Sequence, residues 1–342
     1  MHNVKVRFAP SPTGYLHVGG LRTALYNYLF AKQNNGEIIL RIEDTDQSRI
    51  VEGASDSLIN IFNKFNIIFD EGPKSVNNGD SYFQSNRIKL YNKHLNYLLE
   101  NGYAYKCYLL PEELSQIRKK AEDLKMGAKY IRNQLRSHSI NNTLDRTKYV
   151  VRLKVPDNEV ISFNDKVRGL IKIQSNEIDD QILMKTDGFP TYHLANVVDD
   201  YEMGITHVIR GEEWLSSTPK HILLYSALGF NCPEFAHLPL LLNSDKTKLS
   251  KRQGDVSVDD FLEKGYMPEA LINFISLLGW HPEHENEILS MKELMKSFSL
   301  ERVQKGGAVF DIDKLNWLNS QYIKKLTFDE FIKQSKKYYP KY

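Results

Sequence analysis

Cysteine is nearly absent from this chain of 342 residues, which contains only Cys107 and Cys232. Two thiols cannot build a disulfide framework, and such scarcity is typical of proteins that fold in a reducing compartment. Long apolar runs are lacking too, since no stretch approaches 18 uninterrupted apolar residues and the N-terminus has no apolar signal segment. These absences exclude a disulfide-rich secreted domain and a helical membrane protein, and they predict a soluble, cytoplasmic protein.

An excess of charge is also lacking. The chain has 45 basic and 43 acidic residues, a net charge of +2, so bulk charge does not indicate a nucleic-acid binder and only local clusters can. No Gly-Lys dipeptide occurs, which excludes a P-loop as the phosphate site. The length allows two or three domains.

A turn near the N-terminus is the first candidate site. Val4–Phe8 alternates as a buried strand does, and Leu21–Ala31 has the composition of a helix. Such a turn presents backbone N–H groups and the positive end of a helix dipole to an anion, and glycines let a phosphate approach closely. The alternative is an ordinary turn with a capping histidine. The residues of interest in the turn are Thr13, Gly14, His17, Gly19 and Gly20.

Acidic residues follow the next apolar run, Gly36–Glu43, which predicts a second parallel strand. Glu43, Asp44 and Asp46 then fall at its carboxyl end, where ligands bind in open α/β sheets. Asp44 and Asp46 could equally be solvated loop residues or cap a helix. Glu43 ends an apolar strand and needs a partner such as an ammonium group.

The middle of the chain has a different character. Ser85–Ile140 is helical with a modest basic excess, a pattern more typical of a solvated helix face than of a binding site. Tyr149–Pro156 and Gly169–Ile173 return to strand alternation. This region is predicted to be a separate α+β module.

The sheet pattern then resumes. Gln181–Asp187, Thr191–Val198 and Thr206–Gly211 are predicted to supply the second half of a nucleotide-binding sheet. Arg210 ends an apolar strand, so a carboxylate partner is expected to offset its burial. The Lys-rich loop Asn243–Asp255 is either simply solvated or a mobile clamp on transferring phosphates. From Val258 onward the pattern is helical.

Several motifs together resemble one family. HVGG at His17–Gly20 resembles the HIGH signature of class I aminoacyl-tRNA synthetases, and KLSKR at Lys248–Arg252 resembles their KMSKS loop. The branch that these and further motifs resemble is the bacterial-type glutamyl-tRNA synthetases. The further motifs are RFAPSPTG at the start, RIEDTD at Arg41–Asp46, FPTYHLANVVDD and GEEWLSSTPKH within Asp187–His221, and GGAVFDIDKLNWLN at Gly306–Asn319.

The resemblance covers essentially the whole chain and implies an α/β architecture. A Rossmann-like catalytic domain with a parallel sheet (residues 1–84 and 189–250) would be split by an inserted α+β domain (85–188) that binds the tRNA acceptor end. A helical stem-contact domain (251–342) would follow. The anticodon-binding domain of the family is absent from this chain, which is therefore either a truncated or a naturally short form.

The resemblance also implies an activity. A glutamate–tRNA ligase joins the α-carboxylate of L-glutamate to the α-phosphate of ATP, which enters with Mg²⁺, and transfers the glutamyl group to the 3′ end of tRNA(Glu), releasing AMP and pyrophosphate. The catalytic residues would be His17, Lys248 and Lys251, and these would bind ATP together with Thr13, Gly19 and Gly20. The glutamate-binding residues would be Arg7, Ala9, Ser11, Glu43, Tyr192, Asn196, Arg210 and Trp214. Arg7 and Arg210 would take the side-chain carboxylate and Glu43 the α-ammonium.

The chain departs from the family pattern in its inserted domain as well as in its length. Some members hold zinc through a Cys-x-Cys start, but here Cys107-Tyr108-Leu109 stands in that place and no second pair follows near Arg132–His138, so we expect no zinc. We also expect a monomer without a membrane partner. The rivals are a short paralog that glutamylates a modified tRNA base, a non-catalytic tRNA-binding relative and a glutaminyl enzyme. The Gly306–Asn319 block favours the ligase over the paralog, and the HVGG and KLSKR motifs favour it over the non-catalytic relative. RFAPSPTG and HVGG disfavour the glutaminyl enzyme.

Overall fold

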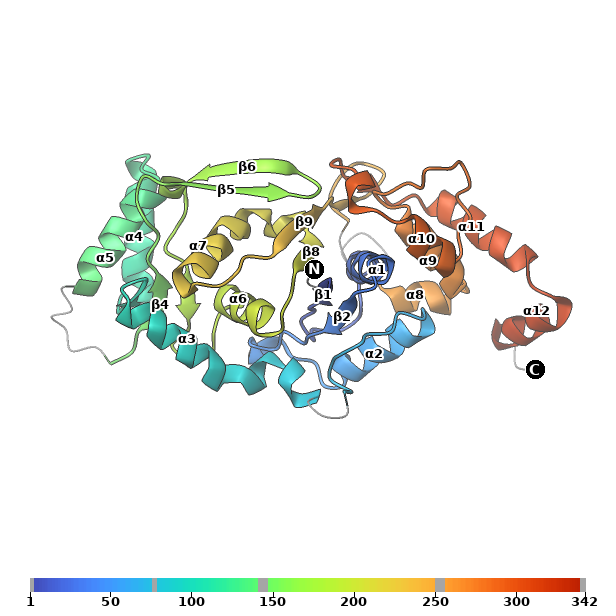
Figure 1. Ribbon diagram of the computed structural model, residues 1–342, viewed down its shortest axis with the longest axis horizontal. Coiled ribbons are helices and arrows are strands. Elements are labelled where there is room, and N and C mark those ends of the chain that lie inside the picture. Colours follow the sequence, from blue (N-terminus) through green and yellow to red (C-terminus); the bar gives the residue numbers. More distant parts are fainter. Residues whose placement is uncertain (1–2, 76–78, 141–146, 250–255, 339–342) are drawn as a thin grey trace.

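Figure 1 shows the computed structural model, which describes residues 3–75, 79–140, 147–249 and 256–338. The chain opens with β1 (Lys5–Phe8), α1 (Val18–Gln33) and β2 (Glu37–Leu40), followed by α2 (Ala54–Lys64). The two strands pair in parallel, Lys5 opposite Glu37 and Phe8 opposite Leu40. The predicted strand–helix–strand opening is confirmed, although β2 ends before Glu43.

A second parallel pair lies beside the first. β8 (His207–Gly211) and β9 (Glu234–Leu238) are joined by α7 (Thr218–Leu228) and pair along their whole length. The backbone N–H of Thr206 donates to the carbonyl of Lys5 (2.8 Å), and the N–H of Lys5 donates to Thr206 Oγ1 (2.9 Å). β2, β1, β8 and β9 therefore lie side by side, although Lys5 and Thr206 are 201 positions apart in the sequence.

Residues 85–188 contain helices and short strands. Their elements are α3 (Ile88–Glu100), β3 (Ala104–Cys107), α4 (Pro111–Asp123), α5 (Ala128–Ile140), β4 (Val150–Leu153), β5 (Val160–Asp165), β6 (Gly169–Gln174) and β7 (Ile182–Met184). β3, β4 and β7 make an antiparallel sheet. The β5–β6 hairpin instead reaches β9, because Asp165 pairs with Phe235. The division into a separate module stays a prediction.

Two segments predicted for the nucleotide-binding sheet lie elsewhere. The strand in Gln181–Asp187 is β7, which pairs with β4. Thr191–Val198 is the start of α6 (Tyr192–Glu202), a helix and not a strand. Leu194, Ala195, Val197 and Val198 are all buried, and a short apolar run of this kind does not distinguish a buried helix from a buried strand.

The remainder of the chain is mostly helical, as predicted. Its helices are α8 (Val258–Glu263), α9 (Pro268–Ser276), α10 (Met291–Ser297), α11 (Ile312–Lys324) and α12 (Phe328–Ser335). A short parallel pair joins β10 (Leu241–Leu242) to β11 (Ala308–Val309). In the part of the chain that the structure describes, no helix is long and apolar enough to cross a membrane.

Alternate residues of the central strands point into two hydrophobic clusters. Ile38 and Leu40 of β2 and Ile209 of β8 join a cluster formed with α1, α2, α9 and α10. Ile39 and Val208 point the other way, into a cluster formed with α3, α6 and α7. This two-residue alternation is what a sheet covered on both faces requires. The predicted α/β class is confirmed, and the carboxyl ends of β1 and β8 are left open to form a site.

Candidate active site

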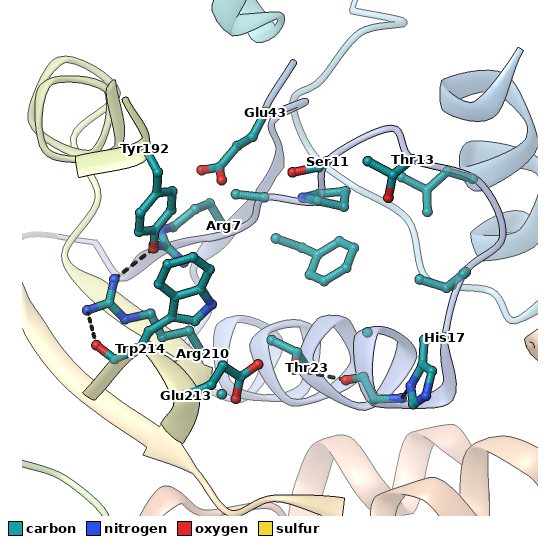
Figure 2. A pocket seen from close by; sticks show the side chains of 18 of the residues that line it. Arg7, Ser11, Thr13, His17, Thr23, Glu43, Tyr192, Arg210, Glu213 and Trp214 are labelled. Atoms are coloured by element: carbon teal, nitrogen blue, oxygen red, sulfur yellow. Dashed lines mark hydrogen bonds between the residues drawn. The ribbon is translucent and has the colours of Figure 1, made fainter. Parts of the chain in front are cut away.

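A cavity of about 330 Å³ opens where β1 and β8 end (Figure 2). Its wall combines the strand-to-helix turn before α1, Glu43 three positions after β2, the start of α6 and the end of β8. All eight residues predicted to bind glutamate line it, namely Arg7, Ala9, Ser11, Glu43, Tyr192, Asn196, Arg210 and Trp214. Thr13, His17, Gly19 and Gly20 line it as well. The fold thus brings together residues from four separate stretches of the sequence.

His17 is the N-cap of α1 and is itself oriented by the helix. Its Nδ1 accepts a hydrogen bond from the backbone N–H of Gly19 (2.9 Å), which requires the neutral ring with its proton on Nε2. Gly19 and Gly20 pack tightly here. A Cβ on Gly19 would lie 3.2 Å from that same Nδ1, and one on Gly20 would lie 2.9 Å from Leu16 Cδ1. Glycine at both positions therefore keeps this turn compact.

A second cavity of about 390 Å³ shares this turn as a common wall. Lys248, predicted to bind ATP, lines it. Thr23, Gly211 and Glu213 line both cavities, and sequence reasoning did not single them out. Glu213 lies in the GEEW stretch that carried the family resemblance, so that stretch was the available signal.

The segment after the Lys-rich loop lies against the His17 turn. The backbone N–H of Val18 donates to the carbonyl of Val256 (2.9 Å), and the N–H of Val258 donates to Leu16 O (2.9 Å). The segment that follows the Lys-rich loop is therefore hydrogen-bonded to the segment that contains His17. Lys251 and Arg252 lie outside the described residues.

Arg210 is held in an unusual way for a buried arginine. It is 4% exposed and forms no ion pair among the described residues, so the expectation of a carboxylate partner stays a prediction. Its guanidinium donates instead to neutral acceptors. They are His237 Nε2 (3.1 Å), Tyr192 Oη (2.9 Å), His221 Nδ1 (3.3 Å), Thr218 Oγ1 (2.9 Å) and the carbonyl of Trp214 (3.4 Å). Hydrogen bonds thus satisfy the group while its positive charge stays uncompensated.

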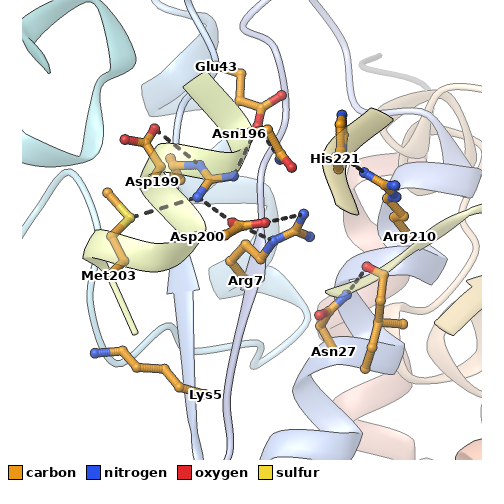
Figure 3. A network of polar contacts seen from close by, with 12 residues as sticks. Lys5, Arg7, Asn27, Glu43, Asn196, Asp199, Asp200, Met203, Arg210 and His221 are labelled. Atoms are coloured by element: carbon orange, nitrogen blue, oxygen red, sulfur yellow. Dashed lines mark hydrogen bonds and ion pairs between the residues drawn. The ribbon is translucent and has the colours of Figure 1, made fainter. Parts of the chain in front are cut away.

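Arg7 differs from Arg210 because its charge is already paired (Figure 3). Its Nε lies 3.0 Å from Asp200 Oδ1 and its Nη2 3.3 Å from Oδ2, while Nη1 takes part in neither bond. Arg41 donates to the same carboxylate (2.7 Å). Arg7 and Arg210 both line the cavity, but Arg210 presents the larger uncompensated positive charge to a ligand.

Glu43 finds a cation, but a guanidinium and not an ammonium. Its Oε1 lies 3.2 Å from Arg41 Nη2 and 3.5 Å from Asn196 Nδ2. Burial raises the pKa of Glu43 above its ordinary value even with Arg41 and Arg7 nearby. A buried carboxylate in this state gains stability from a further cation in the cavity.

The neighbouring acids have structural partners. Asp44 is buried and accepts from the backbone N–H (2.8 Å) and hydroxyl (2.6 Å) of Ser85, so it joins β2 to the next segment. Asp46 is the N-cap of a short 3-10 helix but makes no capping hydrogen bond with its side chain. Among the described residues no group of three or more metal-ligating side chains occurs. The expectation of no zinc stays a prediction.

Two buried histidines, His221 and His237, contact Arg210, and sequence reasoning missed both. His193, which is half-buried, joins them because its Nδ1 lies 3.0 Å from His221 Nε2. Burial, with the nearby cations Lys220 and Arg210, lowers the pKa of His193 to about 4. Burial and Arg210 also lower the pKa values of His221 and His237. The pocket thus favours neutral imidazoles.

This arrangement predicts acid sensitivity at mild pH. An unfolded histidine binds a proton near pH 6.5 whereas folded His193 binds one only near pH 4, so between these values the unfolded state holds more protons. Stability should therefore fall as pH falls from about 6.5 towards 4. We expect the Tm to be several degrees lower at pH 5 than at pH 7.5. His193→Gln should flatten this dependence, whereas exposed His284→Gln should not, and a constant Tm would contradict the prediction.

Comparison with known proteins agrees with this site. A family model described as "tRNA synthetases class I (E and Q), catalytic domain" matches residues 3–317. The glutamate–tRNA ligase of Alkaliphilus metalliredigens (strain QYMF) is 50% identical over 97% of this chain and 69% of its own length. That of Clostridioides difficile (strain 630) is 53% identical over 94% and 68%. The crystal structure of a glutamate-tRNA synthetase from Elizabethkingia anophelis has a TM-score of 0.91 to this chain at 42% identity, over 98% of this chain and 74% of that one.

A second solved structure, from Elizabethkingia meningosepticum, is of a glutamate tRNA ligase in complex with its amino acid, with a TM-score of 0.90 at 42% identity over 98% of this chain and 72% of that chain. The matched family model, the identity to curated relatives and these two folds all agree with the motifs that meet around the cavity. The chain belongs to the class I tRNA synthetases for glutamate and glutamine, in the branch of the glutamate–tRNA ligases.

Proposed function

We propose that the 330 Å³ cavity holds glutamate between Arg210 and Glu43 while the cavity beside it holds ATP. The observation that carries this proposal is the uncompensated charge of Arg210, buried among neutral acceptors on the cavity wall. A carboxylate ligand supplies the missing partner. Glu43 supplies an anion for the α-ammonium, so the two ends of a zwitterionic amino acid with an acidic side chain are both matched.

The remaining pocket residues orient the substrate. Tyr192 and Trp214 pack with ring centroids 4.1 Å apart, and the Tyr192 hydroxyl, which accepts from Arg210, keeps its own proton for a substrate oxygen. Asn196 is held near Glu43. Arg7 assists through its remaining Nη1, with a charge that Asp200 has largely offset. Ala9 and Ser11 complete the wall on the β1 side.

Adenylate formation follows from the shared wall of the two cavities. An oxygen of the glutamate α-carboxylate attacks the α-phosphorus of ATP, and the bond from that phosphorus to the pyrophosphate oxygen breaks. The step needs alignment and stabilisation of phosphate charge. His17 Nε2–H and Thr13 supply hydrogen-bond donors, the turn at Gly19 and Gly20 lets the phosphates approach closely, and Lys248 with Lys251 supplies cations. Mg²⁺ enters as part of the substrate MgATP.

The three-part arrangement predicted from the sequence completes the proposal. Residues 1–84 and 189–250 carry the catalytic cavities, residues 85–188 receive the tRNA acceptor end, and residues 251–342 contact the stem. Support comes from the separate antiparallel sheet β3–β4–β7 within 85–188 and from the helices after Val258. The ribose at the tRNA 3′ end then accepts the glutamyl group and AMP leaves. A role in translation places this work in the cytoplasm.

Glutamate-dependent ATP–pyrophosphate exchange tests the proposal. The purified chain should catalyse exchange when glutamate and tRNA(Glu) are both present, and less or none without tRNA. Glutamine should not replace glutamate. Folded protein that catalyses no exchange under either condition would refute catalysis by this chain.

A further inference from the structure

Two residues outside the cavity wall, His237 and Asp165, form a chain of hydrogen bonds that ends at Arg210. His237 on β9 places Nε2 3.1 Å from Arg210 Nε, and its Nδ1 lies 2.6 Å from Asp165 Oδ2. His237 and Asp165 are 0% and 1% exposed. Neither lines either of the cavities that share the His17 turn. Asp165 belongs to β5, so the chain of contacts runs from the β5–β6 hairpin to the substrate arginine.

The chemistry of these contacts fixes the protonation of His237. A guanidinium Nε–H can only donate, so His237 Nε2 must accept and the ring proton must be on Nδ1. That proton is donated to Asp165 Oδ2. The other oxygen, Oδ1, accepts from the backbone N–H groups of Val167 (3.0 Å), Arg168 (2.9 Å) and His237 (3.2 Å). The carboxylate is thus held by four donors and dictates the tautomer.

A neutral acceptor at this place has a consequence for selectivity. Arg7 shows the alternative: a carboxylate in direct contact with a guanidinium orients it but offsets its charge. The imidazole of His237 orients Arg210 equally well and keeps Asp165 one ring further away. Glutamate and glutamine have nearly the same shape, so the charge at Arg210 is what distinguishes a carboxylate from an amide.

We propose that His237, with its tautomer set by Asp165, is a positioning residue that determines specificity: it fixes Arg210 without neutralising it and so maintains selection of glutamate over glutamine. The inference rests on the proposed function, in which Arg210 binds the substrate side chain. His237 touches neither substrate, and its effect passes through Arg210.

Asp165→Asn tests the tautomer. The three backbone N–H groups would hold the amide oxygen in the Oδ1 place, which turns the amide NH₂ towards His237 Nδ1. The ring must then carry its proton on Nε2. Two donors, this N–H and the Nε–H of Arg210, would face each other, and their hydrogen bond would be lost. We expect the KM for glutamate in tRNA(Glu)-dependent exchange to rise about tenfold or more, the scale of a lost hydrogen bond to a charged group. The KM for ATP and the inhibition constant of glutamine should stay within about twofold of their wild-type values, because neither depends on the Arg210 charge.

His237→Gln and His237→Glu separate orientation from neutrality. Gln can still accept from Arg210 without charge, whereas Glu places a carboxylate against it. We expect His237→Glu to raise the KM for glutamate at least tenfold, while glutamine inhibits this variant as well as it inhibits the wild type, or better. His237→Gln should keep most of the selectivity for glutamate over glutamine. His207→Gln, on the same strand as Arg210 but outside the cavity, is the matched control and should leave both constants unchanged.

The outcomes distinguish this inference from the proposed function. If folded Asp165→Asn and His237→Glu proteins keep the wild-type ratio of the glutamate KM to the glutamine inhibition constant, while Arg210→Met loses it, only the role of His237 is refuted. If Arg210→Met also keeps the ratio, the carboxylate site itself is misplaced. If Asp165→Asn does not fold, as judged by circular dichroism, the glutamate KM and the glutamine inhibition constant of His237→Gln and His237→Glu decide whether His237 has the proposed role.

Discussion

Replacing Arg210 by Met is expected to lower kcat/KM for glutamate by about 10²–10⁴-fold, because the substrate carboxylate would enter a buried pocket and find no cation. The KM for ATP should stay within about threefold of the wild-type value, since Arg210 lines the first cavity and not the second. Steady-state exchange kinetics with glutamate and ATP varied in turn, in the presence of tRNA(Glu), measure both quantities.

Two further variants make this result specific. Arg152→Met removes another buried arginine, which donates to the carbonyl of Asp180 and lines neither cavity, so it should affect stability but not the KM for glutamate. Arg210→Lys keeps the charge without the fork of donors and should recover part of the activity. Equal losses of glutamate and ATP affinity in Arg210→Met would show that the arginine does not bind the amino acid.

Local patterns predicted much of the site because its parts stand at element ends. The strand, turn and helix around His17 could be read from alternation, glycine and helical composition. Glu43 and Arg210 were singled out because each follows or ends an apolar strand, where an ionised group is costly. The family motifs predict that the His17 turn and the Lys-rich loop share a site, and His17 and Lys248 line the same cavity.

What could not be predicted depends on contacts between distant segments. The neutral hydrogen-bond acceptors of Arg210 could not be predicted, because the fold supplies them from α6, α7 and β9. Asp165 and His237 are 72 residues apart and meet only because the β5–β6 hairpin pairs with β9. The start of α6 was mistaken for a strand because its apolar run is compatible with both structures.

Asp200→Asn should produce the largest loss of stability. The network around Asp200 contains Arg7, Arg41 and Arg87 against Glu43, Asp199 and Asp200, so three positive charges are balanced by three negative ones. An amide at 200 leaves one positive charge unbalanced, and its NH₂ group faces a guanidinium donor. Breaking a buried pair on one side costs about 3–5 kcal/mol.

The measurement is urea or thermal unfolding at neutral pH, where the loss corresponds to a decrease in Tm of roughly 10 °C. The matched control is Asp56→Asn, which breaks the exposed pair with Lys74 (3.4 Å) and should change stability by less than about 1 kcal/mol.

Arg7 and Arg41 lower the pKa of Asp200, despite the opposing effect of burial. The stability that Asp200 contributes is therefore present above the pKa of an unfolded aspartate and is lost only as the pH falls below it. The cost of Asp200→Asn should therefore be constant from pH 6 to 8, whereas an effect equal to that of Asp56→Asn would mean that Arg7 and Arg41 do not depend on this carboxylate. Because Arg7 lines the glutamate cavity and Arg41 holds Glu43, the same substitution should also raise the KM for glutamate, which links the stability of the central sheet to the site at its carboxyl edge.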